Sequence, residues 1–255
     1  MMNLFDLTGK KAIVTGASRG LGRAIAEGYM KSGAETVLVA SGAAAAEEAA
    51  AGYREKGFKC HAVAADLRDE AARSAGFEKA LALLGGRLDI LVNCAGAMRR
   101  CKSEDYSLED WNLLIDVNLT ATFRMCQLAG KVMLAQGSGK IINIASMLSF
   151  FGGFIVPAYA ASKGGVAQLT KALCNEWAGR GVNVNAIAPG YMATEMTAAL
   201  SDPSSPRYHE IVDRIPAHRW GTPEDLQGPA VFLASDASDY LNGAIIPVDG
   251  GYLVR

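Results

Sequence analysis

A tyrosine and a lysine four residues apart form the pair with the clearest chemical potential in this chain. Of the eight tyrosines, only Tyr159 is followed at that spacing by a lysine, Lys163, and in a helix this spacing places both side chains on one face. Ser146 ends an apolar run 13 residues before the tyrosine. Alone, the pair would indicate a contact on a helix surface, but with the serine it indicates a catalytic site.

These groups suit proton transfer at an alcohol or carbonyl oxygen. Tyrosine is a weak base at neutral pH because its ordinary pKa is about 10, and a neighbouring ammonium or an oxidised nicotinamide would lower that pKa. We expect Tyr159 to take a proton from an alcohol as hydride leaves carbon, or to return one to a carbonyl, while Ser146 holds the reacting oxygen. Asn118, polar within an apolar helix, is expected to bind a water that relays protons towards Lys163, the alternative being a buried amide bonded to the protein.

A glycine-rich turn, TGASRGLG at residues 15–22, follows the first apolar run and opens into a helix-length segment. A helix N-terminus offers free N–H groups and partial positive charge, and glycines let a pyrophosphate approach the backbone. The GxxxGxG spacing differs from the common GxGxxG fingerprint. Because the turn lies between an apolar run and a helix, we nevertheless predict a dinucleotide site. The alternative is a tight turn with a glycine-packed helix start.

The residue types near this turn favour NADP(H) over NAD(H). The fingerprint expects an acidic residue about 20 positions on, to hold the ribose hydroxyls, yet Ser41 and Gly42 stand there. Neither Ser41 nor Gly42 would repel a 2′-phosphate, and the guanidinium of Arg19 could pair with that phosphate. The alternative for Arg19 is a solvated turn residue. Asp66 is expected to accept a hydrogen bond from adenine, to cap the following helix, or both.

The elements that must position these groups alternate along the chain. Seven short apolar runs are separated by helix-length segments: 12–15, 36–40, 60–64, 90–93, 140–144, 182–187 and 244–248. Strands apolar on both faces and separated by helices predict a Rossmann-type, doubly wound α/β domain spanning 1–255, with a seven-stranded parallel sheet and helices on both faces. Residues 191–216 follow the sixth strand, where such sheets bind ligands, and contain helix breakers, so we expect a mobile substrate loop there.

Composition narrows the class of protein. The chain has 255 residues, 50% of them hydrophobic, and its 25 basic residues nearly balance 26 acidic ones, so neither nucleic acid nor a charged membrane is an expected partner. No apolar run approaches the roughly 18 to 20 residues that span a bilayer, and residues 1–10 lack a signal-peptide layout. Five cysteines without CxxC, and histidines away from metal-ligand spacing, predict a cytoplasmic protein with reduced thiols and no metal.

The chain resembles the short-chain dehydrogenase/reductase family over essentially its whole length. The matching motifs are TGxxxGxG at 15–22, a variant of NNAG at 93–96 in which Cys94 replaces the usual second Asn, the helix Asn118, Ser146, the YxxxK pair, Pro189-Gly190, and VDGG at 248–251. The resemblance implies a catalytic tetrad of Asn118, Ser146, Tyr159 and Lys163. It also implies a homotetramer or homodimer that packs through long helices at 111–136 and 159–179.

The family resemblance completes the set of expected cofactor contacts, adding those around the nicotinamide. The full set is Gly16, Ser18, Arg19, Gly20, Leu21, Gly22, Ser41, Asp66, Leu67, Asn93, Ala95, Gly96, Tyr159, Lys163, Pro189, Gly190, Met192 and Thr194.

Four segments, at 140–150, 175–178, 188–194 and 214–221, resemble the sugar-acid branch of the family, the 2-dehydro-3-deoxy-D-gluconate and gluconate 5-dehydrogenases. Arg99 and Arg100 follow the fourth strand, where a guanidinium could clamp a substrate carboxylate, or they are a solvated basic pair.

We therefore expect an NAD(P)-dependent oxidoreductase that interconverts a secondary alcohol and a ketone on a sugar acid, with substrate contacts from Ser146, Tyr159, Arg99 and Arg100. The alternatives are a 3-oxoacyl thioester reductase, and a non-catalytic nucleotide-binding regulator, which would not need to keep the tetrad together.

Overall fold

The computed structural model describes residues 4–255; residues 1–3, part of the stretch assessed for a signal peptide, lie outside the described residues. Its centre is one parallel sheet of seven strands in the order β3-β2-β1-β4-β5-β6-β7. The strands are β1 Lys11–Thr15, β2 Glu35–Ala40, β3 Cys60–Ala64, β4 Ile90–Asn93, β5 Gly139–Ile144, β6 Val182–Pro189 and β7 Ile245–Val248. The predicted fold class is confirmed.

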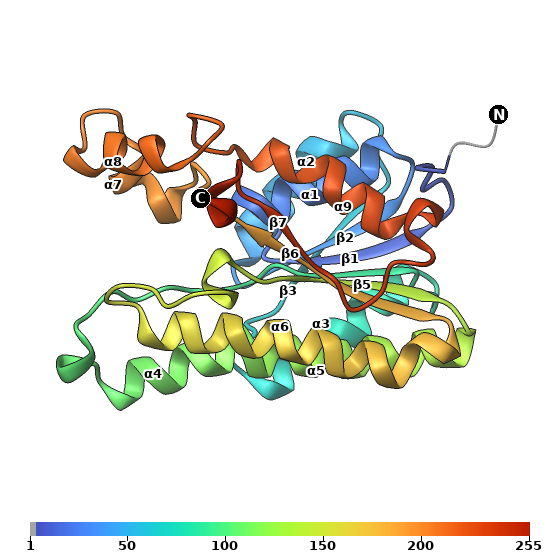
Figure 1. The fold of residues 1–255 in the computed structure, drawn as a ribbon. Helices are drawn as coiled ribbons and strands as arrows, with labels where there is room; N and C mark the ends of the chain where they lie inside the picture. Colours follow the sequence, from blue (N-terminus) through green and yellow to red (C-terminus); the bar gives the residue numbers. More distant parts are fainter. Residues whose placement is uncertain (1–3) are drawn as a thin grey trace.

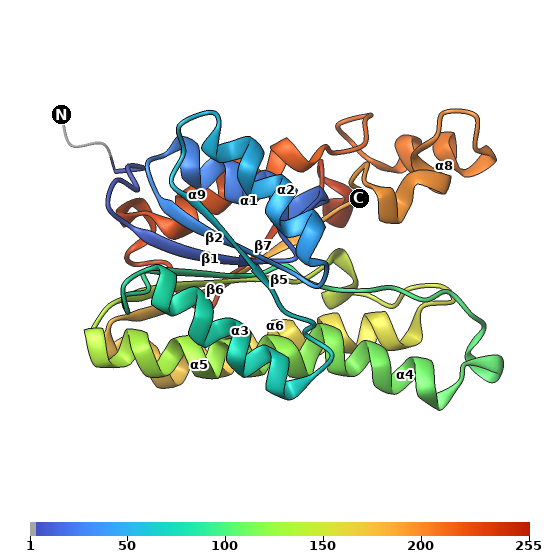
Figure 2. The same cartoon turned by 180° about the vertical axis from the view of Figure 1, so that it is seen from behind.

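Helices cover both faces of the sheet (Figures 1 and 2). One face carries α1 Gly20–Lys31, α2 Ala43–Arg54 and α9 Gln227–Ala234. The other carries α3 Glu70–Leu83, α5 Ala121–Gln136 and α6 Pro157–Trp177. Strands β1 and β4 are neighbours, but the strand that follows β1 lies on one side of this pair and the strand that follows β4 lies on the other. The carboxyl ends of β1 and β4 therefore form the switch point where such folds bind ligands.

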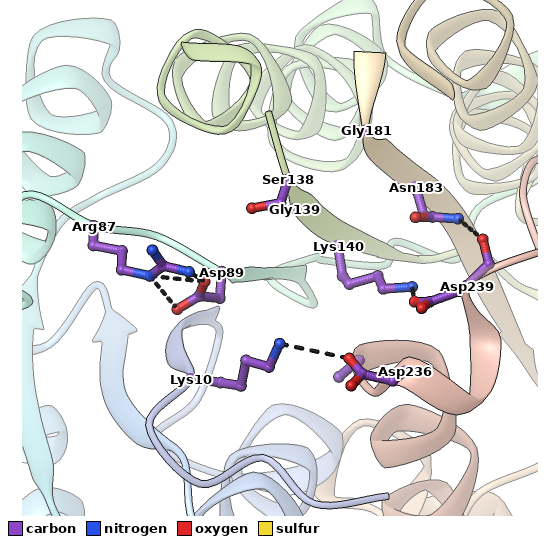
Figure 3. Close-up of a pocket in the computed structure, with 11 residues that line it drawn as sticks. Lys10, Arg87, Asp89, Ser138, Gly139, Lys140, Gly181, Asn183, Asp236 and Asp239 are labelled. Carbon is purple, nitrogen blue, oxygen red and sulfur yellow. Dashed lines mark hydrogen bonds and ion pairs between the residues drawn. The ribbon is translucent and has the colours of Figure 1, made fainter. Parts of the chain in front are cut away.

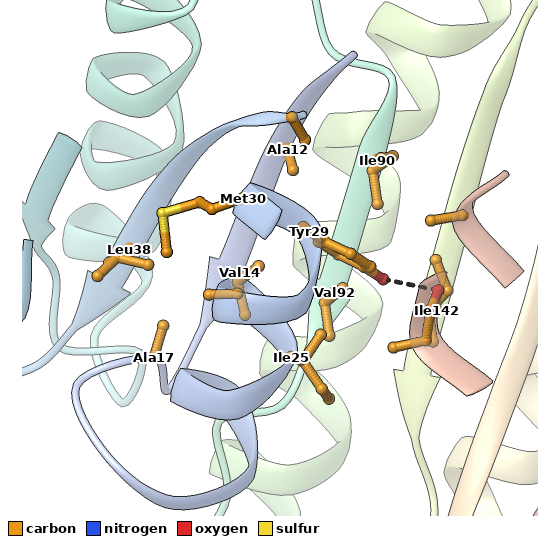
Figure 4. Close-up of a cluster of buried hydrophobic side chains, with 14 of the residues drawn as sticks. Ala12, Val14, Ala17, Ile25, Tyr29, Met30, Leu38, Ile90, Val92 and Ile142 are labelled. Atoms are coloured by element: carbon orange, nitrogen blue, oxygen red, sulfur yellow. Dashed lines mark hydrogen bonds between the residues drawn. The ribbon is translucent and has the colours of Figure 1, made fainter. Parts of the chain in front are cut away.

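Side chains alternate between two apolar layers along each central strand. In β1, Ala12 and Val14 face the layer under α1 and α9, whereas Ile13 faces the layer above α5 and α6. Figure 4 shows the first layer, where the Tyr29 hydroxyl also donates to the Ala230 carbonyl at 3.3 Å. Burial on both faces explains the near-continuous apolar runs from which the strands were predicted.

The two long helices differ slightly from their predicted bounds. The first begins earlier, as α4 Leu108–Ile115, because the Ser107 side chain caps it by accepting from the Asp110 amide at 3.0 Å. A π-helical turn, Asp116–Thr120, then joins α4 to α5. The second, α6, begins at Pro157 and ends at Trp177. The π turn was not predicted, because apolar spacing does not reveal one extra residue in a turn.

The segment after β6 leaves the body of the molecule and returns to it. It contains α7 Ala198–Ser201 and α8 Pro206–Arg214, which protrude beyond the carboxyl ends of the strands (Figure 1). Its two ends are joined at the base, where the Ala193 amide donates to Gly221 at 2.8 Å and the Gly221 amide donates to Tyr191 at 2.9 Å. The predicted substrate loop thus holds two short helices on a closed base.

None of the helices between residues 4 and 255 is long and apolar enough to cross a membrane.

Candidate active site

The glycine-rich turn is built on two positions where a side chain would not fit. Gly16 has a φ of +65°, and an added Cβ would lie 2.8 Å from the Ala95 Cα. At Gly22 an added Cβ would lie 2.4 Å from the Gly16 carbonyl oxygen. These contacts bring the start of α1 close to the ends of β1 and β4, so backbone rather than side chains lines the turn.

The start of α1 fits the phosphates of a dinucleotide. The helix begins at Gly20, and the preceding Arg19 has an extended backbone with no side-chain cap. The first N–H groups of the helix therefore have no side-chain acceptor, and they lie beside a turn with almost no side-chain bulk. An anionic cofactor group would supply the missing acceptors, which is the arrangement predicted from the sequence.

Thr15 fixes the second wall of this site. Its hydroxyl donates to the Val92 carbonyl at 3.2 Å and accepts from the amides of Cys94 at 3.0 Å and Ala95 at 3.2 Å. Since residue 94 contributes its backbone amide to this link, cysteine in place of the family's usual asparagine leaves the link intact. Burial raises the pKa of the Cys94 thiol to about 11, so it stays protonated at neutral pH.

Asn93 turns its side chain into the sheet. Its amide donates to the Asn143 oxygen at 2.9 Å, and the Asn143 amide in turn donates to the Thr170 hydroxyl at 3.0 Å. All three are buried. This chain of hydrogen bonds joins β4, β5 and α6, and it leaves the main chain of Asn93 for the predicted cofactor contact.

The structure brings Ser146, Tyr159 and Lys163 together at the carboxyl end of β5. The side chain of Ser146 hydrogen-bonds to the Tyr159 hydroxyl and accepts from the Leu148 amide at 3.1 Å. The Lys163 ammonium lies 5.7 Å from the centre of the tyrosine ring and donates to the Ile144 carbonyl at 2.6 Å. The expected helical spacing therefore does place tyrosine and lysine on one face.

Burial dominates the proton affinities of these groups. It raises the pKa of Tyr159 to about 12, against the opposing effect of the Ser146 hydrogen bond, and it lowers the pKa of Lys163 to about 8. The pKa of Tyr159 is therefore not lowered in the chain alone, because desolvation is the largest effect on it. A protonated tyrosine suits proton donation to a carbonyl, whereas the opposite direction requires added positive charge.

The low pKa of Lys163 predicts a pH-dependent cost to stability. The folded protein releases this proton near pH 8, whereas an unfolded lysine keeps it to about 10.5. Between these pH values the unfolded state binds more protons than the folded state. The contribution of Lys163 to the unfolding free energy therefore rises with pH. The unfolding free energy of the wild type minus that of Lys163→Met should increase by about 2 kcal/mol from pH 7 to pH 9.5, measured by urea denaturation.

Lys171→Met is the matched control, because that lysine is exposed on the same helix. A difference from the wild type that rises no more steeply with pH for Lys163→Met than for this control would contradict a lowered pKa at Lys163.

Asn118 lies in the π-helical turn and is fully buried. Its side-chain oxygen accepts from the Ala97 amide at 2.8 Å, and its nitrogen donates to the Ala97 carbonyl at 3.0 Å and to the Ser162 hydroxyl at 3.1 Å. The side chain is thus hydrogen-bonded to the protein, as in the alternative of a buried amide, and a contact with a relay water stays a prediction. It holds the turn after β4 against α6, within reach of Lys163.

Asp66 follows β3 but does not cap the next helix. Its carboxylate accepts from the Arg68 amide at 3.0 Å and pairs with the Arg68 guanidinium, while the cap of α3 is Asp69, which accepts from the Ala72 amide at 2.7 Å. The capping alternative is therefore wrong, because the chain makes one more turn before the helix starts. Contact with adenine stays a prediction.

The base of the predicted substrate loop lies over the glycine-rich turn. A Cβ added at Gly20 would lie 4.0 Å from the methyl group of Thr194, and the Arg19 guanidinium forms an ion pair with Glu195. A little further back, Gly190 packs against Asp249, which an added Cβ would approach to 2.6 Å. Predicted cofactor contacts near residue 20 and near residue 190 therefore lie close together.

The substrate contacts predicted from arginine are less well placed. Arg99 is 59% exposed at its side chain and pairs with Asp110 of α4 at 3.3 Å, so a substrate carboxylate would have to exchange with Asp110. Arg100 is exposed beside it.

Sequence reasoning missed several residues that hold the site together. Asn143 and Ser162 bind Asn93 and Asn118 respectively, and Glu195 pairs with Arg19. Asn143 carried a signal, because it is a polar residue in an apolar strand, and the neighbouring strand holds a second such residue, Asn93. For Ser162 and Glu195 no signal exists, because their partners are distant in sequence.

A cavity lies at the opposite end of the sheet. It measures about 320 Å³ and is lined by residues at the amino ends of the strands, as Figure 3 shows. Its cations are paired internally: Lys10 with Asp236 at 3.6 Å, Arg87 with Asp89 at 2.6 Å and Lys140 with Asp239 at 2.8 Å. With its charges already balanced, this cavity lacks the chemistry found at the carboxyl ends.

Comparison with known proteins defines the class. The family model of the short chain dehydrogenases matches residues 10–205, and the chain belongs to this family. A 2-dehydro-3-deoxy-D-gluconate 5-dehydrogenase of Pseudoalteromonas atlantica is 48% identical over 100% of both chains. A Beutenbergia cavernae protein, solved with NADP at low occupancy, is 49% identical with a TM-score of 0.95 over 99% of this chain and 100% of that one.

A gluconate 5-dehydrogenase of Burkholderia cenocepacia, solved with NADP and tartrate, is 38% identical with a TM-score of 0.94 over 99% of this chain and 98% of that one. The family resemblance, including its sugar-acid branch, is confirmed. The chain is an NAD(P)-dependent oxidoreductase that acts on CH–OH groups.

Proposed function

We propose that this enzyme interconverts a secondary alcohol and a ketone on a sugar acid such as 2-dehydro-3-deoxy-D-gluconate or gluconate. The observation that carries the chemistry is the meeting of Ser146, Tyr159 and Lys163 beside the glycine-rich turn. The substrate class is supported by relatives over the full chain that are named for these two sugar acids.

Each residue of the proposed tetrad has a distinct part. When bound, a nicotinamide cofactor exchanges the hydride with the substrate carbon. The Tyr159 hydroxyl takes the proton of the substrate hydroxyl during oxidation and returns it during reduction. Ser146, which already hydrogen-bonds the tyrosine, holds the reacting oxygen, and Lys163 keeps positive charge beside the tyrosine ring. Asn118 positions the turn after β4.

We propose NADP(H) as the preferred cofactor. The supporting features are the absence of a carboxylate at Ser41 and the guanidinium of Arg19 at the start of α1, together with NADP in related structures. Ser18, Leu21, Leu67, Pro189 and Met192 stay among the proposed cofactor contacts.

The direct test is initial-rate spectrophotometry at 340 nm. Gluconate and a 3-deoxy-2-keto sugar acid would each be assayed with NAD⁺ and NADP⁺, and a 3-oxoacyl thioester would be assayed in the reducing direction. Turnover of a sugar acid supports the proposal. Reduction of the thioester alone would move the enzyme to the acyl-reductase class.

Arg99 and Arg100 provide a test of acid recognition. If they clamp the carboxylate, Arg99→Gln with Arg100→Gln should raise the KM for the sugar acid about tenfold or more, while the kcat/KM for a neutral polyol of similar size changes little. Arg180→Gln, at an exposed arginine just before the amino end of β6, is the control. Equal losses for acid and polyol would show that the pair does not read the carboxylate.

We also propose a homotetramer or homodimer in the cytoplasm. All five cysteines are free, as suits a reducing compartment. Phe123 of α5 and Leu108 of α4 leave apolar surface exposed beside the long helices, as suits a partner subunit. Light scattering on the purified protein would measure the mass directly.

A further inference from the structure

The ion pair between Arg19 and Glu195 links the cofactor turn to the substrate loop. Arg19 directly precedes α1, and Glu195 lies one residue beyond Thr194, in the first turn of a short helix at the loop base. The side chains of the pair are 73% and 71% exposed. Ion pairs so open to water are weak and exchange readily for a stronger partner.

Glu195 is held in place by its neighbours. The Thr194 amide donates to the Thr197 hydroxyl at 3.0 Å, and that hydroxyl donates to the Met192 carbonyl. Met192 is buried and paired with Gly221 at the loop base. The carboxylate of Glu195 is therefore carried on an anchored backbone rather than on the protruding part of the loop.

We propose that Glu195 is a specificity-determining residue that competes with the 2′-phosphate of NADP(H) for Arg19. This inference rests on the proposed role of Arg19 in the cofactor site. A bound 2′-phosphate would take the guanidinium in a charge-assisted, two-point contact, displacing Glu195 and leaving two anions close together. NAD(H) has no such phosphate, so it binds while the ion pair stays formed. Glu195 thereby reduces the preference for NADP(H) and lets the enzyme use both cofactors.

The experiment measures binding without substrate. Dissociation constants for NADP⁺ and NAD⁺ would be measured by calorimetry on the full-length wild type, Glu195→Gln, Arg19→Ala and the double variant. Glu195→Gln should bind NADP⁺ about threefold to tenfold more tightly and NAD⁺ within twofold of the wild type. In the Arg19→Ala background the same change should lose most of its effect, because the competition needs the guanidinium.

Glu210→Gln is the matched control, since Glu210 is an exposed glutamate on α8 of the same loop, and it should leave both constants unchanged. The proposal is overturned if Glu195→Gln leaves the NADP⁺ constant unchanged, or if it tightens both cofactors equally. A weaker NADP⁺ complex in Arg19→Ala alongside an unchanged Glu195→Gln would keep the proposed cofactor preference and reject only the competition. Because no turnover is measured, an error in the sugar-acid assignment does not affect the result.

Discussion

Replacing Tyr159 with phenylalanine should lower kcat for the sugar acid by about 10³-fold while leaving cofactor affinity almost unchanged. The substitution removes the hydroxyl that Ser146 contacts but keeps the ring that lies beside Lys163. The proton transfer is the main loss, because the phosphates of the dinucleotide are held at the glycine-rich turn and the ring of Tyr159, a proposed cofactor contact, stays in place. Steady-state rates and a fluorescence titration with the reduced cofactor measure the two effects separately.

Tyr240→Phe provides the comparison, because this tyrosine is fully exposed and far along the chain from the site. It should behave as the wild type. If Tyr159→Phe kept more than a tenth of the wild-type kcat, another group would have to move the proton, and the assignment of the base would be wrong.

The second large effect is expected at Gly22. An alanine Cβ would lie 2.4 Å from the Gly16 carbonyl oxygen and 3.1 Å from that of Thr15. Both are backbone atoms, so relief requires α1 to move away from β1. Gly22→Ala should therefore lower the unfolding free energy by about 1 to 3 kcal/mol and weaken cofactor binding at least about tenfold, as the phosphate-facing N–H groups shift.

Gly52→Ala is the control for a helical glycine, because an added Cβ there meets nothing within 4 Å. Alanine at this position of α2 should raise stability by about 0.5 to 1 kcal/mol through the lower flexibility of the unfolded chain. Denaturation of both variants and calorimetry with NADP⁺ test the pair together. A Gly22→Ala variant as stable as the wild type would mean that the turn tolerates the methyl group.

The fold could be predicted because its signals are local. Runs such as 12–15 and 90–93 are apolar up to the polar residue that ends each, as strands buried on both faces require, and the helices between them leave only a doubly wound arrangement. The meeting of Ser146, Tyr159 and Lys163 was predictable for a similar reason, since Tyr159 and Lys163 are helical neighbours and Ser146 ends a strand. In each case a short window contains the necessary information.

The parts that could not be predicted depend on partners far along the chain. In the sequence Asn118 is recognisable only as a polar residue in an apolar helix. Its structural role comes from its hydrogen bonds to Ala97 and Ser162. The pKa of Tyr159 likewise depends on burial by the whole fold, which outweighs the hydrogen bond of Ser146. Glu195 acquires its importance only because the loop base folds over Arg19.

The closed base of the substrate loop has a consequence for how such enzymes diversify. Main-chain hydrogen bonds among Tyr191, Ala193 and Gly221 fasten both ends of the excursion to the body, and the entropic cost of closing a loop grows only slowly with its length. The exposed tip of this excursion, residues 202–207, is therefore free to lengthen, shorten or be exchanged as one cassette, whereas Ile211 and Ile215 behind it share a buried apolar cluster with Met147 and Tyr252. Selection, or a library confined to this cassette, can explore new carbonyl substrates on an unchanged hydride-transfer frame.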